Sequence, residues 1–386
     1  MIISYLNEFK EGMMATLTPN WSDSMAGAGS GITNTMVNGL SAIATCNGYA
    51  FQYDFALGGD PIRNDLTGIG KGEVRIAYND LSKTVYFGCN GHIQAVMFNS
   101  FSTCVWSTPI TLTNAVDTVT SVLVSRMGYI YAGANGYVYK INADGQELYS
   151  NPMTGTGNNE VRLALSPDEK KLFVGTNGQV LALSADDMKE QWRLTLPGWD
   201  WHGSTSNTVS VLSSLYQDAT NSGRNWPWLY IGCNGWIYSI DLTAATPQVT
   251  AMTQSLQANL GAGDTRLAYD SANSLLYVGL SGCAACLDAS LRQPAKWTYE
   301  YFKSPGRVAN VTFGPVQVFL GTNGQVALIE GGKCKSNGPV PNGGTNPVSL
   351  SVGPISCDPA TPDYATSVRL MAGVNGYVSS YLVGTP

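Results

Sequence analysis

The chain has 386 residues, of which 44% are hydrophobic and 12% charged. This hydrophobic content supports a large core and excludes an intrinsically disordered chain. The formal net charge is −6 and no basic tract is present, so nucleic acid is not expected as a partner. No apolar run reaches the roughly 18 residues of a membrane span, and none is expected.

The N-terminal residues do not form a recognisable secretory signal. Glu8 and Glu11 lie where a basic start and a long apolar stretch would stand. We therefore expect either a cytoplasmic protein or a secreted one whose leader has been removed.

One short phrase recurs along the whole chain, with β-branched and aromatic residues on both sides of a turn. Seven turns are Asn-Gly, and the sixth is Ser281-Gly282. Asn-Gly supplies the two positive φ angles of a type I′ turn, so each phrase predicts a β-hairpin. The turn glycines are Gly48, Gly91, Gly136, Gly178, Gly235, Gly282, Gly324 and Gly376.

Further strands flank these hairpins. We expect a strand before the hairpin at 74–78, 161–165 and 265–269, and another after it at 104–110, 191–196 and 296–301. Four strands in each of eight repeats predict an all-β fold, an eight-bladed β-propeller of four-stranded antiparallel blades forming a single domain over residues 1–386. A glycine three positions before most turn glycines, such as Gly88 or Gly175, indicates close backbone approach.

The last repeat lacks a fourth strand. It has a first strand near 347–356 and the hairpin around Gly376, and then the chain ends. The segment 13–21 has no other place in the repeat pattern. We expect it to close the ring by joining the last blade, which removes an exposed sheet edge.

A second pattern occurs in alternate blades. Blades 2, 4 and 6 carry Glu/Asp-x-Arg before the first strand and a tryptophan in the fourth. The pairs are Glu73 and Arg75, Glu160 and Arg162, and Asp264 and Arg266; the tryptophans are Trp106, Trp192 and Trp297. Trp21 is the matching tryptophan for blade 8. The alternation indicates a pseudo-fourfold ring of double blades.

The blade KLFVGTNGQVLALSADDMKEQWRLTL (171–196) resembles the PQQ-type repeat of the quinoprotein-dehydrogenase-like propellers. The resemblance implies eight four-stranded blades with a fourth-strand tryptophan that docks between blades. The family's docking motif runs from an Asp through Thr-Gly to Trp; here Asp186 and Trp192 remain without the Thr-Gly. The adjacent Cys-Cys pair of the enzymes is also missing, so the resemblance implies the fold more than the quinone activity.

The three Glu/Asp-x-Arg pairs form the first candidate site. Residues two apart on a strand face the same side, so Arg75, Arg162 and Arg266 could bind an anion or a sugar acid at the channel mouth. Alternatively, each pair makes an ion pair between blades, and the recurrence of the pairs at one position favours this reading.

A tryptophan-rich loop forms the second candidate. Trp199, Asp200, Trp201 and His202 follow the last strand of blade 4. An indole offers a flat apolar face to a sugar ring, and Asp200 and His202 add hydrogen-bonding groups. The alternative is a packed loop. The phrase NWPW (225–228) directly precedes a strand, which favours a structural role.

The residues that follow the turns form the third candidate. His92, Tyr137 and Trp236 occupy this position in blades 2, 3 and 5, on the face that carries the Asn-Gly turns. They could contribute to an aromatic binding rim, or they could serve the hairpins alone.

Metal and cysteine chemistry have little support. With two histidines in the chain, no metal site is expected. Cys46, Cys89 and Cys233 share one repeat position and are expected to be buried free thiols. A disulfide between Cys334 and Cys357 would imply an oxidising compartment, and it stays open.

The sequence leaves three functions open. A non-catalytic, lectin-like protein that binds a glycan or another small ligand on the loop face has the most support. A protein-interaction scaffold and a quinoprotein-like enzyme are the alternatives. No cofactor is predicted; PQQ or calcium would be expected only for the enzyme.

Overall fold

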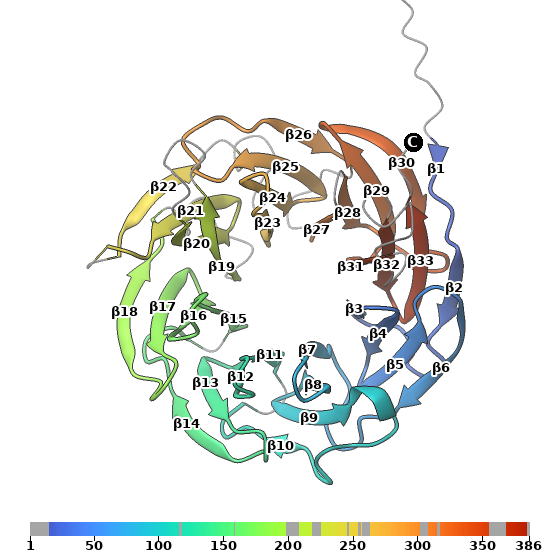
Figure 1. Ribbon diagram of the computed structural model, residues 1–386, viewed down its shortest axis with the longest axis horizontal. Helices are drawn as coiled ribbons and strands as arrows, with labels where there is room; N and C mark the ends of the chain where they lie inside the picture. The colour runs from blue at the N-terminus through green and yellow to red at the C-terminus, as the bar shows by residue number, and fades with distance from the viewer. Residues whose placement is uncertain are drawn as a thin grey trace, which may run out of the picture.

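The computed structural model describes residues 15–115, 118–157, 159–197, 208–217, 225–244, 247–253, 256, 263–301, 308–314, 317–354 and 368–383. They form eight sheets arranged radially around a common axis (Figure 1). The predicted eight-bladed β-propeller is therefore confirmed. Over these ranges, no helix is long and apolar enough to cross a bilayer.

Each blade runs outward in strand order from the channel. Blade 1 has β3 (Asn34–Asn38), β4 (Ser41–Cys46), β5 (Tyr49–Asp54) and β6 (Gly58–Asn64). Blade 2 has β7 (Arg75–Asn79), β8 (Thr84–Cys89), β9 (His92–Met97) and β10 (Ile110–Thr111). Blade 3 has β11 (Ser121–Val124), β12 (Ile130–Ala134), β13 (Tyr137–Ile141) and β14 (Glu147–Asn151). Blade 4 has β15 (Arg162–Leu165), β16 (Lys171–Thr176), β17 (Gln179–Ser184) and β18 (Glu190–Thr195).

The second half repeats this order. Blade 5 has β19 (Val209–Gln217), β20 (Asn225–Cys233), β21 (Trp236–Asp241) and β22 (Val249–Thr253). Blade 6 has β23 (Arg266–Asp270), β24 (Leu275–Leu280), β25 (Cys283–Asp288) and β26 (Trp297–Glu300). Blade 7 has β27 (Asn310–Phe313), β28 (Val318–Thr322), β29 (Gln325–Glu330) and β30 (Lys333–Pro339). Blade 8 has β31 (Ser349–Pro354), β32 (Val368–Val374) and β33 (Tyr377–Val383).

The N-terminal segment closes the ring, but further along the chain than predicted. β2 (Trp21–Ser24) pairs antiparallel with β33, and Trp21 lies opposite Ser380. β1 (Ala15–Thr16) instead pairs in parallel with β30 of blade 7 (Figure 1). The prediction that 13–21 completes blade 8 was therefore wrong in its bounds, because the free outer edge of β30 takes up the residues before Trp21. Residues 13 and 14 lie outside the described part.

The Asn-Gly turns have the expected backbone. In blade 2, Asn90 has φ 48° and Gly91 has φ 75°, as a type I′ turn requires. The asparagine side chain has a second role. Asn90 Nδ2 donates to Lys71 O at 2.8 Å, which holds the loop that enters the same blade. The turn asparagines of blades 1, 3, 4 and 8 make the equivalent bond.

The glycines before the turns lie against the next blade. A Cβ at Gly88 would lie 2.6 Å from Thr120 O, and one at Gly175 would lie 2.5 Å from Val209 O. Neighbouring blades therefore meet backbone to backbone at this level, which confirms the predicted close approach.

The tryptophans of alternate blades dock on the next blade. Trp21 Nε1 donates to Phe55 O at 3.2 Å in blade 1, and Trp106 Nε1 donates to Ala143 O at 3.0 Å in blade 3. The alternation expected from the sequence thus corresponds to a physical joint between blades.

Two predicted strand assignments need correction. The strand expected at 104–110 is reduced to one bridge at Cys104 and to β10 at Ile110–Thr111. Pro109 lies between them and has no N–H to donate to a ladder. The phrase NWPW lies within β20, which begins at Asn225, and not before a strand.

Candidate functional site: an arginine-lined channel

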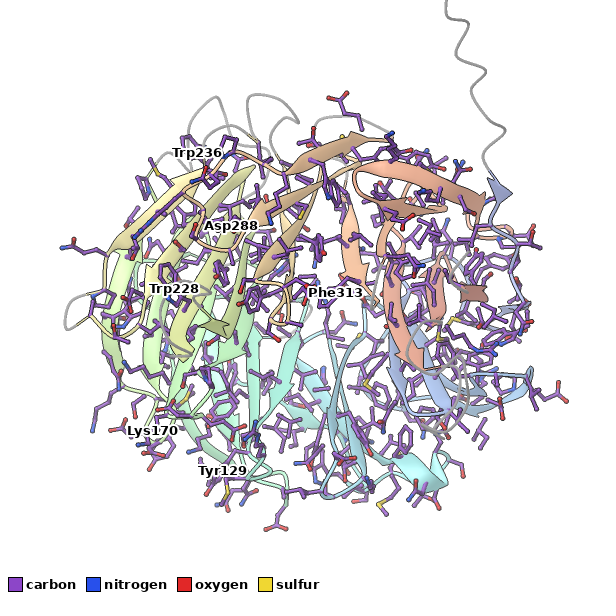
Figure 2. The ribbon with its side chains drawn as sticks, turned by 45° about the horizontal axis from the view of Figure 1, so that its top comes forward. Tyr129, Lys170, Trp228, Trp236, Asp288 and Phe313 are labelled. Carbon is purple, nitrogen blue, oxygen red and sulfur yellow. The ribbon has the colours of Figure 1, made fainter. Side chains whose placement is uncertain are left out.

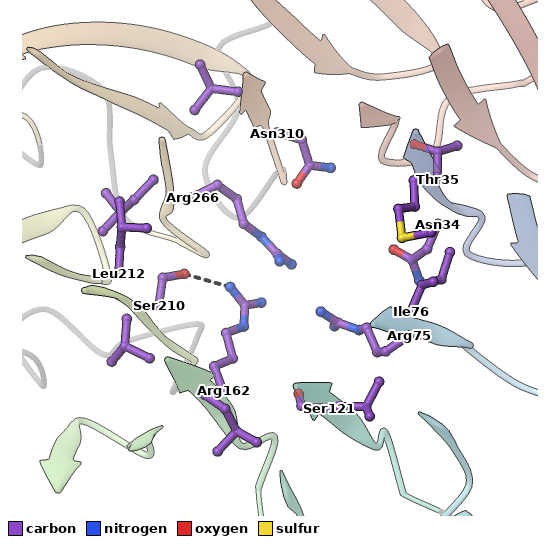
Figure 3. A pocket seen from close by; sticks show the side chains of 16 residues that line it. Asn34, Thr35, Arg75, Ile76, Ser121, Arg162, Ser210, Leu212, Arg266 and Asn310 are labelled. Carbon is purple, nitrogen blue, oxygen red and sulfur yellow. Dashed lines mark hydrogen bonds between the residues drawn. The ribbon is translucent and has the colours of Figure 1, made fainter. Parts of the chain in front are cut away.

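The first strands of the eight blades place one residue each at the same level of the channel. Each of these residues pairs with the residue three positions before its turn glycine, so the level lies close to the Asn-Gly turns. Seven of the eight residues appear in Figure 3: Asn34, Arg75, Ser121, Arg162, Ser210, Arg266 and Asn310. The eighth is Ser349 of blade 8. The channel therefore carries three guanidiniums from blades 2, 4 and 6 and short polar side chains from the others.

A cavity of about 420 Å³ occupies the channel at this level. The three arginines line it, and Figure 3 shows them converging from separate blades. The next residues along the first strands supply most of the remaining wall, and many are aliphatic. They include Met36, Ile76, Val122, Leu163, Leu212 and Leu267. The site thus combines positive charge at one level with an apolar wall.

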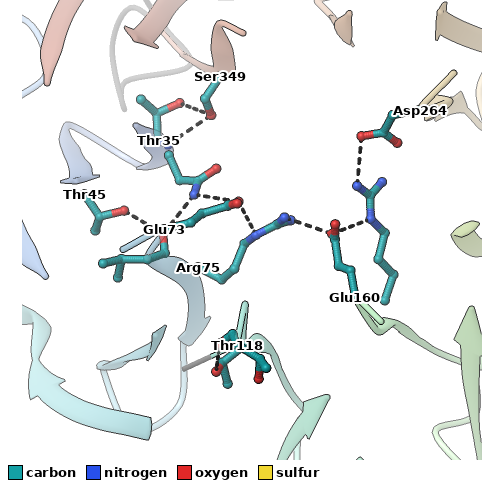
Figure 4. Close-up of polar contacts among 12 residues, drawn as sticks. Thr35, Thr45, Glu73, Arg75, Thr118, Glu160, Asp264 and Ser349 are labelled. Carbon is teal, nitrogen blue, oxygen red and sulfur yellow. Dashed lines mark hydrogen bonds and ion pairs between the residues drawn. The ribbon is translucent and has the colours of Figure 1, made fainter. Parts of the chain in front are cut away.

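The arginines belong to a chain of ion pairs that crosses the channel (Figure 4). Arg75 Nε lies 2.5 Å from Glu73 Oε1 of its own blade, and Arg75 Nη2 lies 2.9 Å from Glu160 Oε1 of blade 4. Arg162 Nε contacts the same Glu160 oxygen at 2.9 Å.

The chain continues into blade 6. Arg162 Nη2 lies 3.1 Å from Asp264 Oδ2, and Arg266 Nη2 lies 2.7 Å from the same oxygen. Arg162 Nη1 also donates to Ser210 Oγ of blade 5 at 2.6 Å. The interblade ion pairs considered from the sequence are therefore present, and they join alternate blades rather than neighbours.

The buried charges stabilise one another. Burial would by itself raise the pKa of Asp264, but Arg162 and Arg266 hold it at about 2. Burial also opposes the charge of Arg162, yet Asp264 and Glu160 raise its pKa. Arg266 differs, because burial and the like charge of Arg162 lower its pKa to about 10. The charge of Arg266 is thus less well compensated than that of Arg162.

Blade 8 interrupts the pattern. Its residues at the acid and arginine positions are Pro347 and Ser349. Ser349 Oγ accepts from Thr35 N at 3.1 Å, which ties blade 8 to blade 1 (Figure 4). A second cavity, of about 80 Å³, lies at this interruption and is lined by Arg266, Asn310, Pro347 and Ser349 among others.

The other predicted site residues do not join this channel site. Trp199, Asp200, Trp201 and His202 lie outside the described residues. Trp236 is 3% exposed and packs in the core between blades 4 and 5, so it offers no free ring face (Figure 2). His92 and Tyr137 are half-buried; His92 Nδ1 lies 2.9 Å from Asn90 O, and Tyr137 stacks on Tyr139.

The cysteines behave mainly as predicted. Cys46, Cys89 and Cys233 are buried free thiols, and burial raises the pKa of Cys89 and Cys233 to about 12. Cys334 also has a free thiol, while Cys357 lies outside the described residues. Within the ranges that the structure describes, no group of three or more His, Cys, Asp or Glu side chains is placed to hold a metal ion.

Sequence reasoning missed Asn34, Ser121 and Asn310, the residues of blades 1, 3 and 7 at the arginine level. Asn34 and Asn310 each lie 14 positions before their turn glycine, close to the 16 of the arginines, so that offset would have found them. Ser210 and Ser349 lie 25 and 27 positions before theirs, because longer segments separate their first and second strands.

Solved structures share this fold at low sequence identity. The crystal structure of Saccharomyces cerevisiae Sqt1 superposes with a TM-score of 0.68 at 14% identity, over 96% of this chain and 99% of that one. The computationally designed Ika8 protein gives 0.62 at 14% identity, over 94% and 98%. No family model matches the sequence, and no curated protein matches it either.

These likenesses show the fold alone. One fold hosts many functions, so the likeness by itself assigns no role to this chain.

Proposed function

We propose that this protein is a non-catalytic binding protein that takes a small organic acid into its central channel. The observation that carries the proposal is the convergence of Arg75, Arg162 and Arg266 on one cavity of about 420 Å³. Guanidinium groups bind carboxylates through charge-assisted hydrogen bonds, and a cavity of this size is within the usual range for small-molecule sites.

The charge balance limits the ligand to few negative charges. Glu73, Glu160 and Asp264 already contact the three arginines, so the set carries no large positive excess. The acids do not line the larger cavity, whereas the arginines do. A ligand with one carboxylate can therefore meet guanidinium groups without displacing an ion pair.

The wall argues for an apolar ligand body. Ile76, Val122 and Leu163 give it aliphatic surface. Two of the polar side chains at the arginine level are already bonded to backbone carbonyls: Asn34 Nδ2 donates to Val74 O at 2.9 Å, and Asn310 Nδ2 donates to Val348 O at 2.7 Å. A carboxylic acid with a hydrocarbon part thus suits the cavity better than a neutral sugar.

Lectin-like glycan binding remains a separate proposal. It depends on Trp199, Asp200, Trp201 and His202. The indoles of the two tryptophans suit the C–H face of a sugar ring, and Asp200 and His202 add hydrogen-bonding groups. It concerns the loop after blade 4 and not the channel, so the two proposals are tested with different ligands.

Titration calorimetry with two ligand sets tests the channel proposal. We expect aliphatic monocarboxylates to bind and neutral monosaccharides of similar size to give no heat. Val122→Phe, which fills the cavity, should weaken binding at least tenfold. The matched control Leu382→Phe adds a phenyl ring on the exposed side of β33 and should leave binding unchanged. Failure of every small acid to bind would overturn the proposal.

A further inference from the structure

The ion-pair chain has a direction. Arg75 and Arg162 each contact the acid of their own blade and also the acid two blades further on, which is Glu160 for Arg75 and Asp264 for Arg162. If this pattern of ion pairs continued around the propeller, blade 8 would supply an acid to contact Arg266 and an arginine to contact Glu73. Blade 8 has Pro347 and Ser349 in these places, so the circle of ion pairs is incomplete there.

The open chain has a basic end and an acidic end. Among the described carboxylates, Asp264 alone lies within ion-pair distance of Arg266, and Asp264 is shared with Arg162. The buried Nε of Arg266 has no hydrogen-bond partner in the described part of the chain. At the other end, Glu73 contacts Arg75, and Asn34 Nδ2 donates to it at 3.3 Å where the pattern requires a guanidinium.

Both ends line the same small cavity. Arg266 borders the space of about 80 Å³ on one side, and Glu73 with its ion-pair partner Arg75 borders it on the other, together with Pro347 and Ser349. A single water molecule needs about 10–15 Å³ of cavity volume, so this space is large enough for a group of several heavy atoms. Arg266 and Asn310 also line the larger cavity, so the two spaces adjoin.

We propose that the gap at blade 8 binds the head group of an α-amino acid with an aliphatic side chain. The carboxylate lies on Arg266 in place of the missing acid, and the ammonium group lies toward Glu73 in place of the missing arginine. The side chain extends along the aliphatic wall of the larger cavity. This inference rests on the proposed binding of small acids in the channel and names their class.

The charges select against other ions. Inorganic phosphate carries negative charge on every side and would meet the Glu73 carboxylate as well as Arg266. A simple amine would meet the Arg266 guanidinium. A zwitterion matches both ends, and burial of the two ends strengthens each interaction relative to water.

The first test compares L-leucine with 4-methylpentanoate, which is leucine without its amino group. Calorimetry on the full chain should show leucine binding at least tenfold more tightly. Glu73→Gln should reduce or reverse this ratio, because the ammonium group loses its partner. The ratio is measured within one variant, so a general loss of stability does not produce the change.

The second test completes the circle of ion pairs. Pro347→Asp with Ser349→Arg places both missing groups on blade 8 without changing the net charge. Leucine binding should be lost and the thermal midpoint should rise. The control Leu382→Gln changes an exposed residue of β33 in the same blade, outside the lining of both cavities, and should retain leucine binding.

The outcomes separate the two proposals. If 4-methylpentanoate binds as tightly as leucine, the channel takes acids but the amino-acid assignment is wrong. The assignment is equally wrong if phosphate competes with leucine, or if the doubly substituted blade 8 still binds leucine. If neither leucine nor any other small acid binds, the proposed function itself is wrong.

Discussion

Arg162 of blade 4 meets Asp264 of blade 6 across the channel, with 3.1 Å between Nη2 and Oδ2, although the two residues are 102 positions apart in the sequence. The same guanidinium contacts Glu160 and Ser210, so one side chain connects blades 4, 5 and 6. Neighbouring blades such as 4 and 5 are held together by a shared hydrophobic core. The Arg162–Asp264 ion pair instead joins blades 4 and 6, which are not neighbours. The ion-pair chain therefore adds a connection that the blade-to-blade packing does not supply.

Removing Arg162 should be strongly destabilising. Arg162→Met leaves Glu160 and Asp264 buried with one arginine each, and breaking a buried ion pair costs about 3–5 kcal/mol. Urea denaturation should show this loss. The control Lys189→Met breaks an ion pair with Asp187 in which the lysine is 82% exposed, and it should leave the stability nearly unchanged. Equal losses in the two variants would contradict a structural role for the chain.

Acid should weaken the same connection. Arg162 and Arg266 hold the pKa of Asp264 at about 2, below its usual 3.8, so the unfolded state binds its proton first as pH falls. The Asp264 charge thus contributes stability above about pH 4, on the order of 2 kcal/mol, and the contribution is lost toward pH 2.

Asp264→Asn tests this linkage. The variant should be less stable than the wild-type protein at pH 7, and the difference should narrow between pH 4 and pH 2. Thermal midpoints measured at half-unit pH steps give the comparison. A difference that stays constant over this range would show that the carboxylate charge is not the cause.

The number and kind of blades followed from local chemistry. Asn-Gly turns and alternating strand residues are read within about ten residues, so each hairpin could be predicted independently. The recurrence of Trp106 with Trp192 and Trp297 predicted the alternation of the blades, whereas the docking of these tryptophans was expected only from the resemblance to the PQQ-type repeat. The close contacts of Gly88 and Gly175 followed from the absence of a side chain at a constant position.

The site depended on distances that the sequence does not encode locally. Arg75 and Glu160 are 85 residues apart, and their contact requires the ring to bring blades 2 and 4 to one channel level. The prediction that Trp236 contributes to a binding rim failed for the same reason. Trp236 follows its turn as Tyr137 does, but its indole packs in the core of blades 4 and 5, whereas Tyr137 stays half-buried. The local turn does not determine whether a neighbouring blade buries the side chain that follows it.

The interblade glycines should not tolerate a methyl group. In Gly175→Ala the new Cβ would lie 2.5 Å from Val209 O, and a backbone carbonyl cannot rotate away. We expect a loss of about 3 kcal/mol in urea denaturation, as for an overpacked core. Blade 1 offers a control, because Thr45 occupies the same repeat position. Thr45→Ala keeps a Cβ there and should cost about 1 kcal/mol for its hydrogen bond to Val74 O. A smaller loss for Gly175→Ala than for Thr45→Ala would refute the close-approach argument.

Ring closure should depend on β2 and much less on β1. Truncating residues 1–24 removes the four paired residues of β2 and the indole of Trp21, which stacks on Tyr53 with ring centroids 5.2 Å apart. This loss leaves β33 as an open edge, so we expect a fall of about 3 kcal/mol or more and concentration-dependent light scattering. Truncating residues 1–16 removes only β1 among the described strands. Because β1 pairs through two residues, the thermal midpoint should stay within a few degrees of the wild-type value. Equal destabilisation by the two truncations would mean that the parallel pairing with blade 7, rather than the fourth strand of blade 8, holds the ring closed.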